Sequence, residues 1–228
     1  CLRGEDSGVY KLILTASGGA VKNKKTSDYP NLTPEEVLNH PNWKMGSKIT
    51  IDSSTLINKA LEVAESRWLF NFGWEQIDVV IHPQSIIHSM VEFDDGSIKA
   101  QLSHPDMRLP IQYSLLEQKR KLNTNLKRLD LTKINQLNFE KLDTKKYPCF
   151  ELAIKILKLN QTWPAALCGI DETAVELFLN NKIKFNQIYT LIKKTLSNHK
   201  PKDNPDIDQI LDSFNWAKAE GYKLAQEL

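Results

Sequence analysis

Short apolar runs bounded by turn residues predict β-strands in the first half of the chain. These runs lie at residues 10–15, 78–81, 86–93 and 97–102. Asp94-Asp95-Gly96 separates the last two runs, and an Asp-Gly pair favours a tight hairpin because it suits turns with positive φ. Residues 48–52 also alternate between polar and apolar positions, so we expect a further strand there.

Other segments have apolar residues at helical spacing. Thr33-Pro34-Glu35-Glu36 combines an N-cap threonine, a proline in the first turn and a capping-box glutamate, so it predicts a short helix that His40-Pro41 ends. Apolar positions between Leu56 and Leu69 predict a helix that covers approximately residues 54–70. A further helix is predicted to end near Leu116.

Amphipathic segments follow one another from residue 147 onward, and four such segments predict a small helical bundle. Residues 117–146 are rich in lysine and asparagine with weak periodicity, which is typical of a linker arm. We therefore expect an α/β (α+β) domain with a mixed sheet and a hairpin over residues 1–116. A linker arm over residues 117–146 and a helical domain over residues 147–228 would follow.

The charge balance gives no indication of a nucleic-acid or membrane partner. The chain has 30 basic and 28 acidic side chains, which gives a formal net charge of +2. No apolar run approaches the roughly 18–20 residues that a membrane-spanning helix needs. Cys1, Cys149 and Cys168 lie far apart without a C-x-x-C motif, so we expect free thiols rather than zinc ligands or disulfides.

A polar arc on the predicted helix at residues 54–70 is suited to an anion. Asn58 and Glu62 are four residues apart and share a face, and Lys59 lies about 100° around the helix from Asn58. Ser53 lies near the predicted N-terminus, where amides and the helix dipole favour a phosphate. Glu62 adds a carboxylate for a hard divalent cation. The alternative is a solvated helix face with a Lys59–Glu62 surface pair that contributes little stability.

Several other residues allow both a functional and a structural interpretation. Ser17-Gly18-Gly19 offers a hydroxyl and backbone amides to an anion, but glycine pairs also mark ordinary turns. His40 and His88 are suited to binding an anionic or hydroxylated substrate or to moving a proton, and a packed histidine explains each equally well. Trp43 and Met45 would form an apolar lid over a small polar ligand or would simply be packed down.

Six segments, taken together, are more specific than any one of them. They are Leu14-Thr15-Ala16-Ser17-Gly18-Gly19, His40-Pro41-Asn42-Trp43-Lys44-Met45-Gly46, Ile51-Asp52-Ser53-Ser54-Thr55, Asn58-Lys59 with Glu62, Ile81-His82-Pro83-Gln84-Ser85-Ile86-Ile87-His88-Ser89-Met90-Val91 and Pro105-Asp106-Met107-Arg108. In order and spacing they resemble the 1-deoxy-D-xylulose 5-phosphate reductoisomerase family. The resemblance covers nearly the whole chain and is strongest through Arg108.

The resemblance implies an isomerisation followed by a reduction. Members of the family rearrange deoxyxylulose phosphate by carbon–carbon cleavage and rejoining to an aldehyde. NADPH then reduces the aldehyde to 2-C-methyl-D-erythritol 4-phosphate, an isoprenoid precursor of the non-mevalonate pathway. A Mg or Mn ion chelates the substrate oxygens and polarises the carbonyl. A homodimer of the full-length enzyme, in the bacterial cytoplasm or a plastid-type organelle, is also implied.

The resemblance further implies how this chain would bind the phosphosugar and the metal. Ser17, Ser53, Asn58 and Lys59 would hold the substrate phosphate. Glu62 would be a metal ligand close to the substrate hydroxyls. Lys59 and Glu62 would thus belong to the catalytic residues.

Histidines and a lid complete the implied site. His40 and His88 would contact the substrate and share in catalysis, and Trp43 and Met45 would belong to a loop that closes over it and excludes water. The remaining implied contacts are Gly46 against the cofactor and Ser85 and Met107 along the wall of the site.

The chain departs from the family pattern in three places. The family's other two metal-binding carboxylates lie upstream of the strand before Ser17, and Glu5 and Asp6 stand in a different context. No G-x-G-x-x-G or equivalent unit is present, so we expect the main NADPH site outside this chain and no turnover by the chain alone. Asp171 stands where the family usually has asparagine, which bears on the start of the local helix.

Two other functions stay open at this point. One is a metal-dependent sugar-phosphate isomerase or aldolase that needs no nicotinamide. The other is a non-catalytic phosphosugar-binding or interaction module, against which the presence of Glu62, Lys59 and both histidines argues.

Overall fold

The computed structural model describes residues 1–2, 4–5, 7–117 and 119–228, so Asp6 lies outside the described residues. The chain forms two compact units, each built from separate segments. Residues 1–17, 42–44 and 72–142 make the first unit, and residues 18–41, 45–71 and 143–228 make the second. The functional boundaries expected after residues 116 and 146 stay a prediction.

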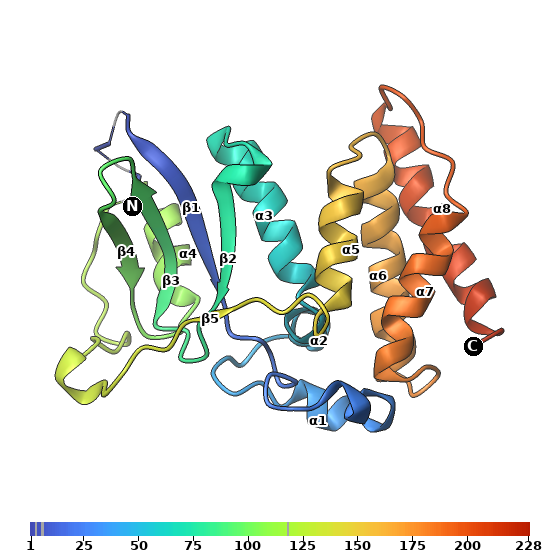
Figure 1. The fold of residues 1–228 in the computed structure, drawn as a ribbon, viewed down its shortest axis with the longest axis horizontal. Coiled ribbons are helices and arrows are strands. Elements are labelled where there is room, and N and C mark those ends of the chain that lie inside the picture. Colours follow the sequence, from blue (N-terminus) through green and yellow to red (C-terminus); the bar gives the residue numbers. More distant parts are fainter. Residues whose placement is uncertain (3, 6, 118) are drawn as a thin grey trace. The chain divides into compact units, whose positions relative to one another are not determined.

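A mixed sheet forms the centre of the first unit, and in the described part of the chain it has five strands in the order β4-β3-β1-β2-β5 (Figure 1). The strands are β1 (Val9–Ala16), β2 (Ile77–Ile81), β3 (Ile87–Phe93), β4 (Ile98–Leu102) and β5 (Glu140–Lys141). β1 pairs in parallel with β2 and antiparallel with β3. The predicted mixed sheet and the β3–β4 hairpin are confirmed, with Gly96 at φ 81° in the turn.

Part of the predicted linker arm is anchored to this sheet. Nδ1 of the fully buried His82 donates to the carbonyl of Asn138 over 2.8 Å, and Nε2 accepts from the amide of Ile86 over 3.2 Å. The imidazole also stacks on Phe139, with 4.9 Å between ring centroids. Beyond these contacts the arm contributes β5 and the 3-10 turn η3 (Leu131–Lys133), elements too short to produce a periodic sequence pattern.

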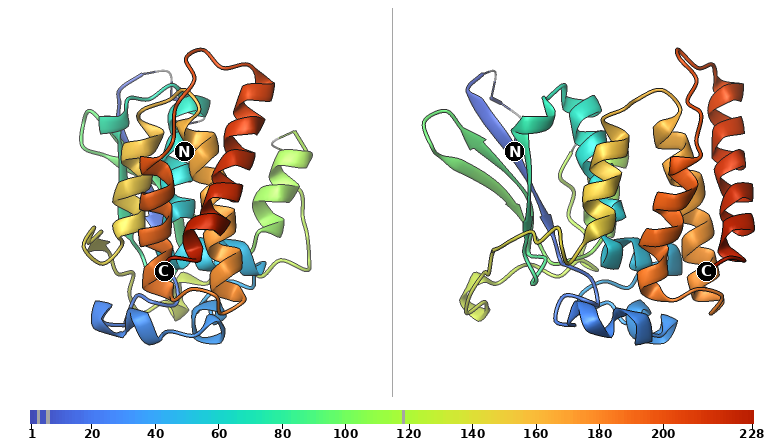
Figure 2. Two further views of the ribbon diagram at one scale, coloured as in Figure 1. Left: turned by 90° about the vertical axis from the view of Figure 1, so that its right-hand side faces the viewer. Right: turned by 45° about the vertical axis from the view of Figure 1, so that its right-hand side comes forward.

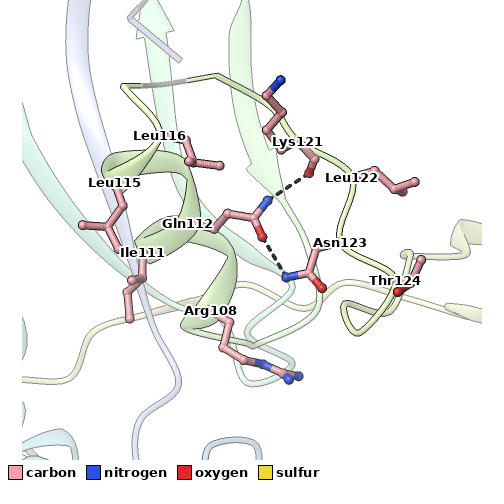
Figure 3. A pocket seen from close by; sticks show the side chains of 9 residues that line it. All are labelled: Arg108, Ile111, Gln112, Leu115, Leu116, Lys121, Leu122, Asn123 and Thr124. Carbon is pink, nitrogen blue, oxygen red and sulfur yellow. Dashed lines mark hydrogen bonds between the residues drawn. The ribbon is translucent and has the colours of Figure 1, made fainter.

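The helix α4 (Arg108–Leu115) confirms the helix that was expected to end near Leu116. Gln112 joins it to the following segment, because its amide donates to the Lys121 carbonyl over 2.9 Å and accepts from Asn123 over 2.7 Å (Figure 3). A pocket between them is lined by Arg108, Ile111, Gln112, Leu115, Leu116, Lys121, Leu122, Asn123 and Thr124. Its lining contains none of the predicted site residues.

Helices make up most of the second unit. They are the 3-10 helix η1 (Thr26–Asn31), α1 (Pro34–Leu38), α2 (Ser47–Thr55), α3 (Ile57–Phe70), α5 (Pro148–Leu157), α6 (Trp163–Leu179), α7 (Phe185–Ser197) and α8 (Ile207–Ala225). The helix α6 packs on both α7 and α8, and α3 packs on α5 (Figure 2). The four predicted C-terminal helices are confirmed, and completely buried residues of this bundle include Ile170, Phe178, Ile188 and Leu191. The apolar stripe predicted for α8 is buried only in part, because Ile210 and Leu211 are 39% and 52% exposed.

Two glycines let α6 and α8 approach each other closely. Gly169 of α6 faces the backbone of α8, and a Cβ added there would lie 2.2 Å from the carbonyl oxygen of Phe214. A Cβ on Gly221 of α8 would lie 2.4 Å from Cδ1 of Ile170. The absence of side chains at these two positions therefore sets the spacing of α6 and α8.

The predicted strand over residues 48–52 is wrong, because these residues lie in α2. Five alternating residues are also compatible with a helix, and Lys48 and Asp52 form an ion pair of 2.6 Å at i,i+4. Leu56 then adopts φ 60°, which ends α2 and separates it from α3. The helix predicted from residue 54 onward therefore begins at Ile57, and Ser53 lies in the last turn of α2.

The short helix predicted after Thr33 is confirmed with its capping box. The Thr33 hydroxyl accepts from the Glu36 amide over 3.3 Å, and the Thr33 amide donates to the Glu36 carboxylate over 3.0 Å. Within the described residues, all three cysteines are free thiols, and none of the helices combines the length and apolarity needed to cross a membrane.

Candidate functional site

The polar arc predicted on α3 is present in the second unit. The Asn58 amide donates to Oε1 of Glu62 over 2.6 Å, and the Lys59 ammonium contacts Oε2 of the same carboxylate. The side chain of Lys59 is only 12% exposed, which does not fit a solvated surface pair. Holding an ammonium group in this partly dehydrated position favours an anionic partner. An amide, an ammonium and a carboxylate are thus gathered on one helix face.

The glycine turn of the second unit lies directly on α2. Gly18 and Gly19 are both buried and have φ 85° and 63°. A Cβ on Gly19 would lie 2.5 Å from Cα of Ser54, so only glycine allows this approach. The Ala20 amide donates to the Ser54 hydroxyl over 3.2 Å. The backbone of the turn therefore lies beside the last turn of α2, where Ser53 donates to the Thr50 carbonyl over 2.8 Å.

A buried tyrosine fixes this glycine turn. The Tyr147 hydroxyl, on a side chain that is 3% exposed, donates to the Gly18 carbonyl over 2.9 Å. We expect Tyr147→Phe to lower the free energy of unfolding by about 1–2 kcal/mol, because the carbonyl keeps its burial and loses its donor. Urea unfolding measures this loss, and Tyr10→Phe on an exposed ring is the matched control. Equal losses in the two variants would show that the turn does not depend on the hydroxyl.

His88 and Trp43 are brought together in the first unit. Their ring centroids are 5.9 Å apart in an edge-on arrangement. Nε2 of His88 lies 2.9 Å from the hydroxyl and 3.3 Å from the carbonyl of Ser103. Because the Ser103 hydroxyl itself donates to the His104 carbonyl, the His88 imidazole is the donor from Nε2 to this hydroxyl. Ser103 therefore fixes the orientation of the His88 ring.

Asn42, the residue before Trp43, holds Ser85 in place. Its side-chain amide donates to the Ser85 hydroxyl over 3.1 Å and also to the Pro83 carbonyl. Ser85 is buried and adopts φ 52°, an uncommon conformation for a residue other than glycine. Sequence reasoning did not single out Asn42, because an isolated asparagine in a loop gives no periodic signal.

The remaining predicted residues occupy varied environments. His40 is half-buried, and this burial lowers the pKa of its imidazole. Met45 is half-buried, and Gly46 is exposed at the N-cap of α2. Ser17 is half-buried, and Met107 is 54% exposed at the start of α4. The first unit contains Ser17, Trp43, Ser85, His88 and Met107, and the second contains His40, Met45, Gly46, Ser53, Asn58, Lys59 and Glu62.

Glu62 is the one residue of this chain that we predict to be a metal ligand. Within the described residues, no three His, Cys, Asp or Glu side chains are grouped so that they could hold a metal ion. A hard divalent cation takes six or more oxygen ligands, of which carboxylates supply the charge. The carboxylate of Glu62 by itself would therefore supply only part of such a site.

Sequence reasoning missed an ionic cluster in the second unit, in which a lysine that is 44% exposed pairs with two buried aspartates. Lys48 pairs with Asp52 of α2 and, over 2.5 Å, with Asp171 of α6. The i,i+4 spacing of Lys48 and Asp52 would have predicted an ion pair if residues 48–52 had been assigned to a helix. The predicted strand excluded that pair. Asp171 lies in the middle of α6, which begins at Trp163, so it has no part in starting a helix.

Comparisons with known proteins agree on one family. The model described as "DXP reductoisomerase C-terminal domain" matches residues 102–220, and that described as "1-deoxy-D-xylulose 5-phosphate reductoisomerase C-terminal domain" matches residues 1–70. The reductoisomerase of Acetivibrio thermocellus is 51% identical over 220 residues, which is 96% of this chain and 56% of that protein. The reductoisomerase of Desulforamulus reducens is 48% identical over 98% of this chain and 58% of its own length.

Solved structures of the same enzyme have a similar fold. The Zymomonas mobilis reductoisomerase in complex with NADPH superimposes with a TM-score of 0.88 at 38% identity, over 97% of this chain and 57% of that one. A reductoisomerase in complex with NADPH, fosmidomycin and magnesium gives a TM-score of 0.90 at 38% identity, over 96% of this chain and 56% of that one. This chain spans little more than half the length of the relatives that it matches.

Proposed function

We propose, from the premise that this chain belongs to the 1-deoxy-D-xylulose 5-phosphate reductoisomerase family, that it supplies the phosphosugar-binding part of such an enzyme. The full-length protein would convert 1-deoxy-D-xylulose 5-phosphate to 2-C-methyl-D-erythritol 4-phosphate. It would do so as a homodimer, in the bacterial cytoplasm or in a plastid-type organelle. Residues 1–116 would carry most of the substrate contacts, and residues 147–228 would support them.

The observation that carries this proposal is the grouping of Asn58, Lys59 and Glu62 on α3. The amide and the ammonium are hydrogen-bond donors for an anion, and Lys59 is largely shielded from water. The Gly18-Gly19 turn, which packs against the neighbouring α2, would add backbone donors for the phosphate. The Ser53 hydroxyl would add another by turning from the Thr50 carbonyl to the phosphate. Ser17 precedes this turn directly and would contribute its hydroxyl.

The other predicted residues would act on the sugar itself. His88, held by Ser103, would bind a substrate oxygen, and the neutral His40 would do the same or transfer a proton. Trp43 and Met45 would cover the bound substrate and exclude water, and Ser85 and Met107 would line the site. Gly46 would lie against the nicotinamide cofactor, whose main site we place outside this chain.

Glu62 would be one carboxylate ligand of a Mg or Mn ion. Such an ion would polarise the substrate carbonyl as a Lewis acid, and NADPH would supply the hydride. The relatives whose structures contain NADPH and magnesium support both assignments. The isolated chain has one predicted metal-binding carboxylate, Glu62, and we place the main NADPH site outside it. We therefore expect it to bind substrate without turnover.

Isothermal titration of the chain with deoxyxylulose phosphate, with and without Mn, tests this proposal. We expect a binding heat that increases with Mn. Lys59→Met should weaken the affinity by ~10- to 100-fold, because a charge-assisted hydrogen bond to the phosphate is lost. Lys182→Met, on an exposed lysine, is the matched control and should bind as the wild type does. A wild-type chain that gives no heat under either condition would contradict the proposed function.

A further inference from the structure

The Lys48–Asp52–Asp171 cluster joins α2 to α6 inside the second unit. The Lys48 ammonium lies 2.6 Å from Oδ2 of Asp52 and 2.5 Å from Oδ2 of Asp171. Asp52 is 5% exposed and Asp171 is 1% exposed, so both carboxyl groups are withdrawn from water. The bond from Lys48 to Asp171 thus links the two helices directly, and the bond to Asp52 lies within α2.

The charges of this cluster do not balance. Two ionised carboxylates and one ammonium leave a net negative charge in a buried site, where an uncompensated charge is costly. Oδ1 of Asp52 and Oδ1 of Asp171 are both buried and have no hydrogen-bond partner among the described residues. The two carboxyl groups also lie within hydrogen-bonding reach of each other. One proton between them would bring the cluster to zero net charge and give one hydrogen bond between the two carboxyl groups.

The surroundings favour this proton. Burial and the neighbouring Asp171 charge raise the pKa of Asp52 to about 7, and burial likewise raises the pKa of Asp171. Glu172 on α6 adds a further negative charge near Asp171, although it pairs with Lys218 of α8 over 2.9 Å. Two more acidic groups face Asp171, the thiols of Cys149 on α5 and Cys168 on α6. Both thiols stay protonated, because burial raises their pKa values.

We propose that Asp52 and Asp171 share one proton around neutral pH, and that this proton and Lys48 together hold α2 on α6 so that Ser53 is positioned for the substrate phosphate. Ser53 is the residue after Asp52 and lies in the same helical turn, so displacement of α2 displaces its hydroxyl. The positioning part of this inference rests on the proposed function. The shared proton does not depend on it.

The sign of the pH effect follows from the raised pKa. Between 3.8, the ordinary value, and about 7, the folded chain holds a proton on Asp52 that the unfolded chain has released. The stability that this proton contributes is present at the acidic end of that window and is lost as the pH rises through it. His40 and His199, whose pKa values burial lowers, change stability in the opposite direction, so variants have to be compared with the wild type at each pH.

Asp171→Asn tests the shared proton, because asparagine keeps the size of the side chain and removes one of the two charges. Urea unfolding should show that the wild type loses stability relative to Asp171→Asn between about pH 5 and about pH 8, by ~10-fold or more in the folding equilibrium. Asp212→Asn, an equal substitution on an exposed part of α8, should follow the wild type. Parallel profiles for the wild type and Asp171→Asn would overturn the proposal.

Carbon-13 NMR of the aspartate carboxyl groups in the wild-type chain gives a readout that needs no variant to fold. We expect one aspartate to titrate around neutral pH. If every aspartate carboxyl titrates near its ordinary value, no proton is shared and the proposal fails.

Titration with inorganic phosphate at the same pH values tests the positioning of Ser53. The wild type should lose affinity relative to Asp171→Asn as the pH rises, and titration of phosphate itself cancels in this comparison. Equal affinities for the two proteins at each pH would overturn the positioning role. An absence of phosphate binding by both proteins would overturn it together with the proposed function, whereas the unfolding and NMR results would still decide the shared proton.

Discussion

Gly169→Ala is expected to lower the free energy of unfolding by about 3 kcal/mol or more, which is a large part of the stability of an ordinary domain. The added methyl group would lie 2.2 Å from the carbonyl oxygen of Phe214, and 3.0 Å from its carbonyl carbon. Both atoms belong to the backbone of α8, so relief requires α6 and α8 to move apart. Urea or thermal unfolding monitored by circular dichroism measures the loss.

Two other glycines provide graded controls for this substitution. A methyl group at Gly221 would meet Cδ1 of Ile170, the end of a flexible side chain, so Gly221→Ala should cost less than Gly169→Ala. Gly73 has a negative φ, and an added Cβ would be 3.4 Å from the Gln76 side chain. Gly73→Ala should therefore leave stability nearly unchanged. If Gly169→Ala unfolds at the same urea concentration as Gly73→Ala, the α6–α8 spacing is not fixed by these glycines.

Glu62→Gln in the full-length protein is expected to reduce kcat/KM by more than ~100-fold. Substitution of a residue that only supports a metal ligand typically costs about 10- to 100-fold, and loss of a direct ligand should cost more. Glutamine has nearly the same size and still accepts a hydrogen bond from Asn58 or Lys59. It lacks the negative charge that would bind the divalent cation. NADPH oxidation in the presence of deoxyxylulose phosphate measures the rate, and a series of Mn concentrations should reveal weakened metal affinity.

Glu65→Gln is the matched control for this prediction, because Glu65 lies on the same helix and is exposed. Its rate should equal that of the wild type. Both variants should stay folded under the assay conditions, since glutamine at position 62 still accepts a hydrogen bond from Asn58 or Lys59. A Glu62→Gln protein with wild-type rates would refute the role of Glu62 and with it the proposed metal chemistry.

Much of the fold follows from local sequence patterns. The Asp-Gly turn, the capping box at Thr33 and the apolar stripe of α7 each have a cause within a few residues of chain, and each is confirmed. Residues 48–52 show the limit of such patterns. Their alternation is too short to distinguish a strand from a helix, and the contacts that favour the helix include a lysine bond to Asp171, 123 residues away.

The candidate site could be predicted only in part for the same reason. The spacing of Asn58, Lys59 and Glu62 places them on one face of any helix, so their hydrogen bonds were foreseeable. The support given to His88 by Ser103, to Ser85 by Asn42 and to Gly18 by Tyr147 depends on tertiary contacts. Neither spacing nor composition indicates which polar residues of separate segments will meet.

The interleaved segments of the two compact units have a practical consequence for dissecting this protein. Because the chain passes from one unit to the other after residues 17, 41, 44, 71 and 142, no single backbone cleavage releases either unit whole. Truncation from either end removes strands or helices on which the remainder packs. Limited proteolysis at one site should therefore yield fragments that stay associated until denaturant is added, and neither half of the chain is a suitable minimal domain for expression.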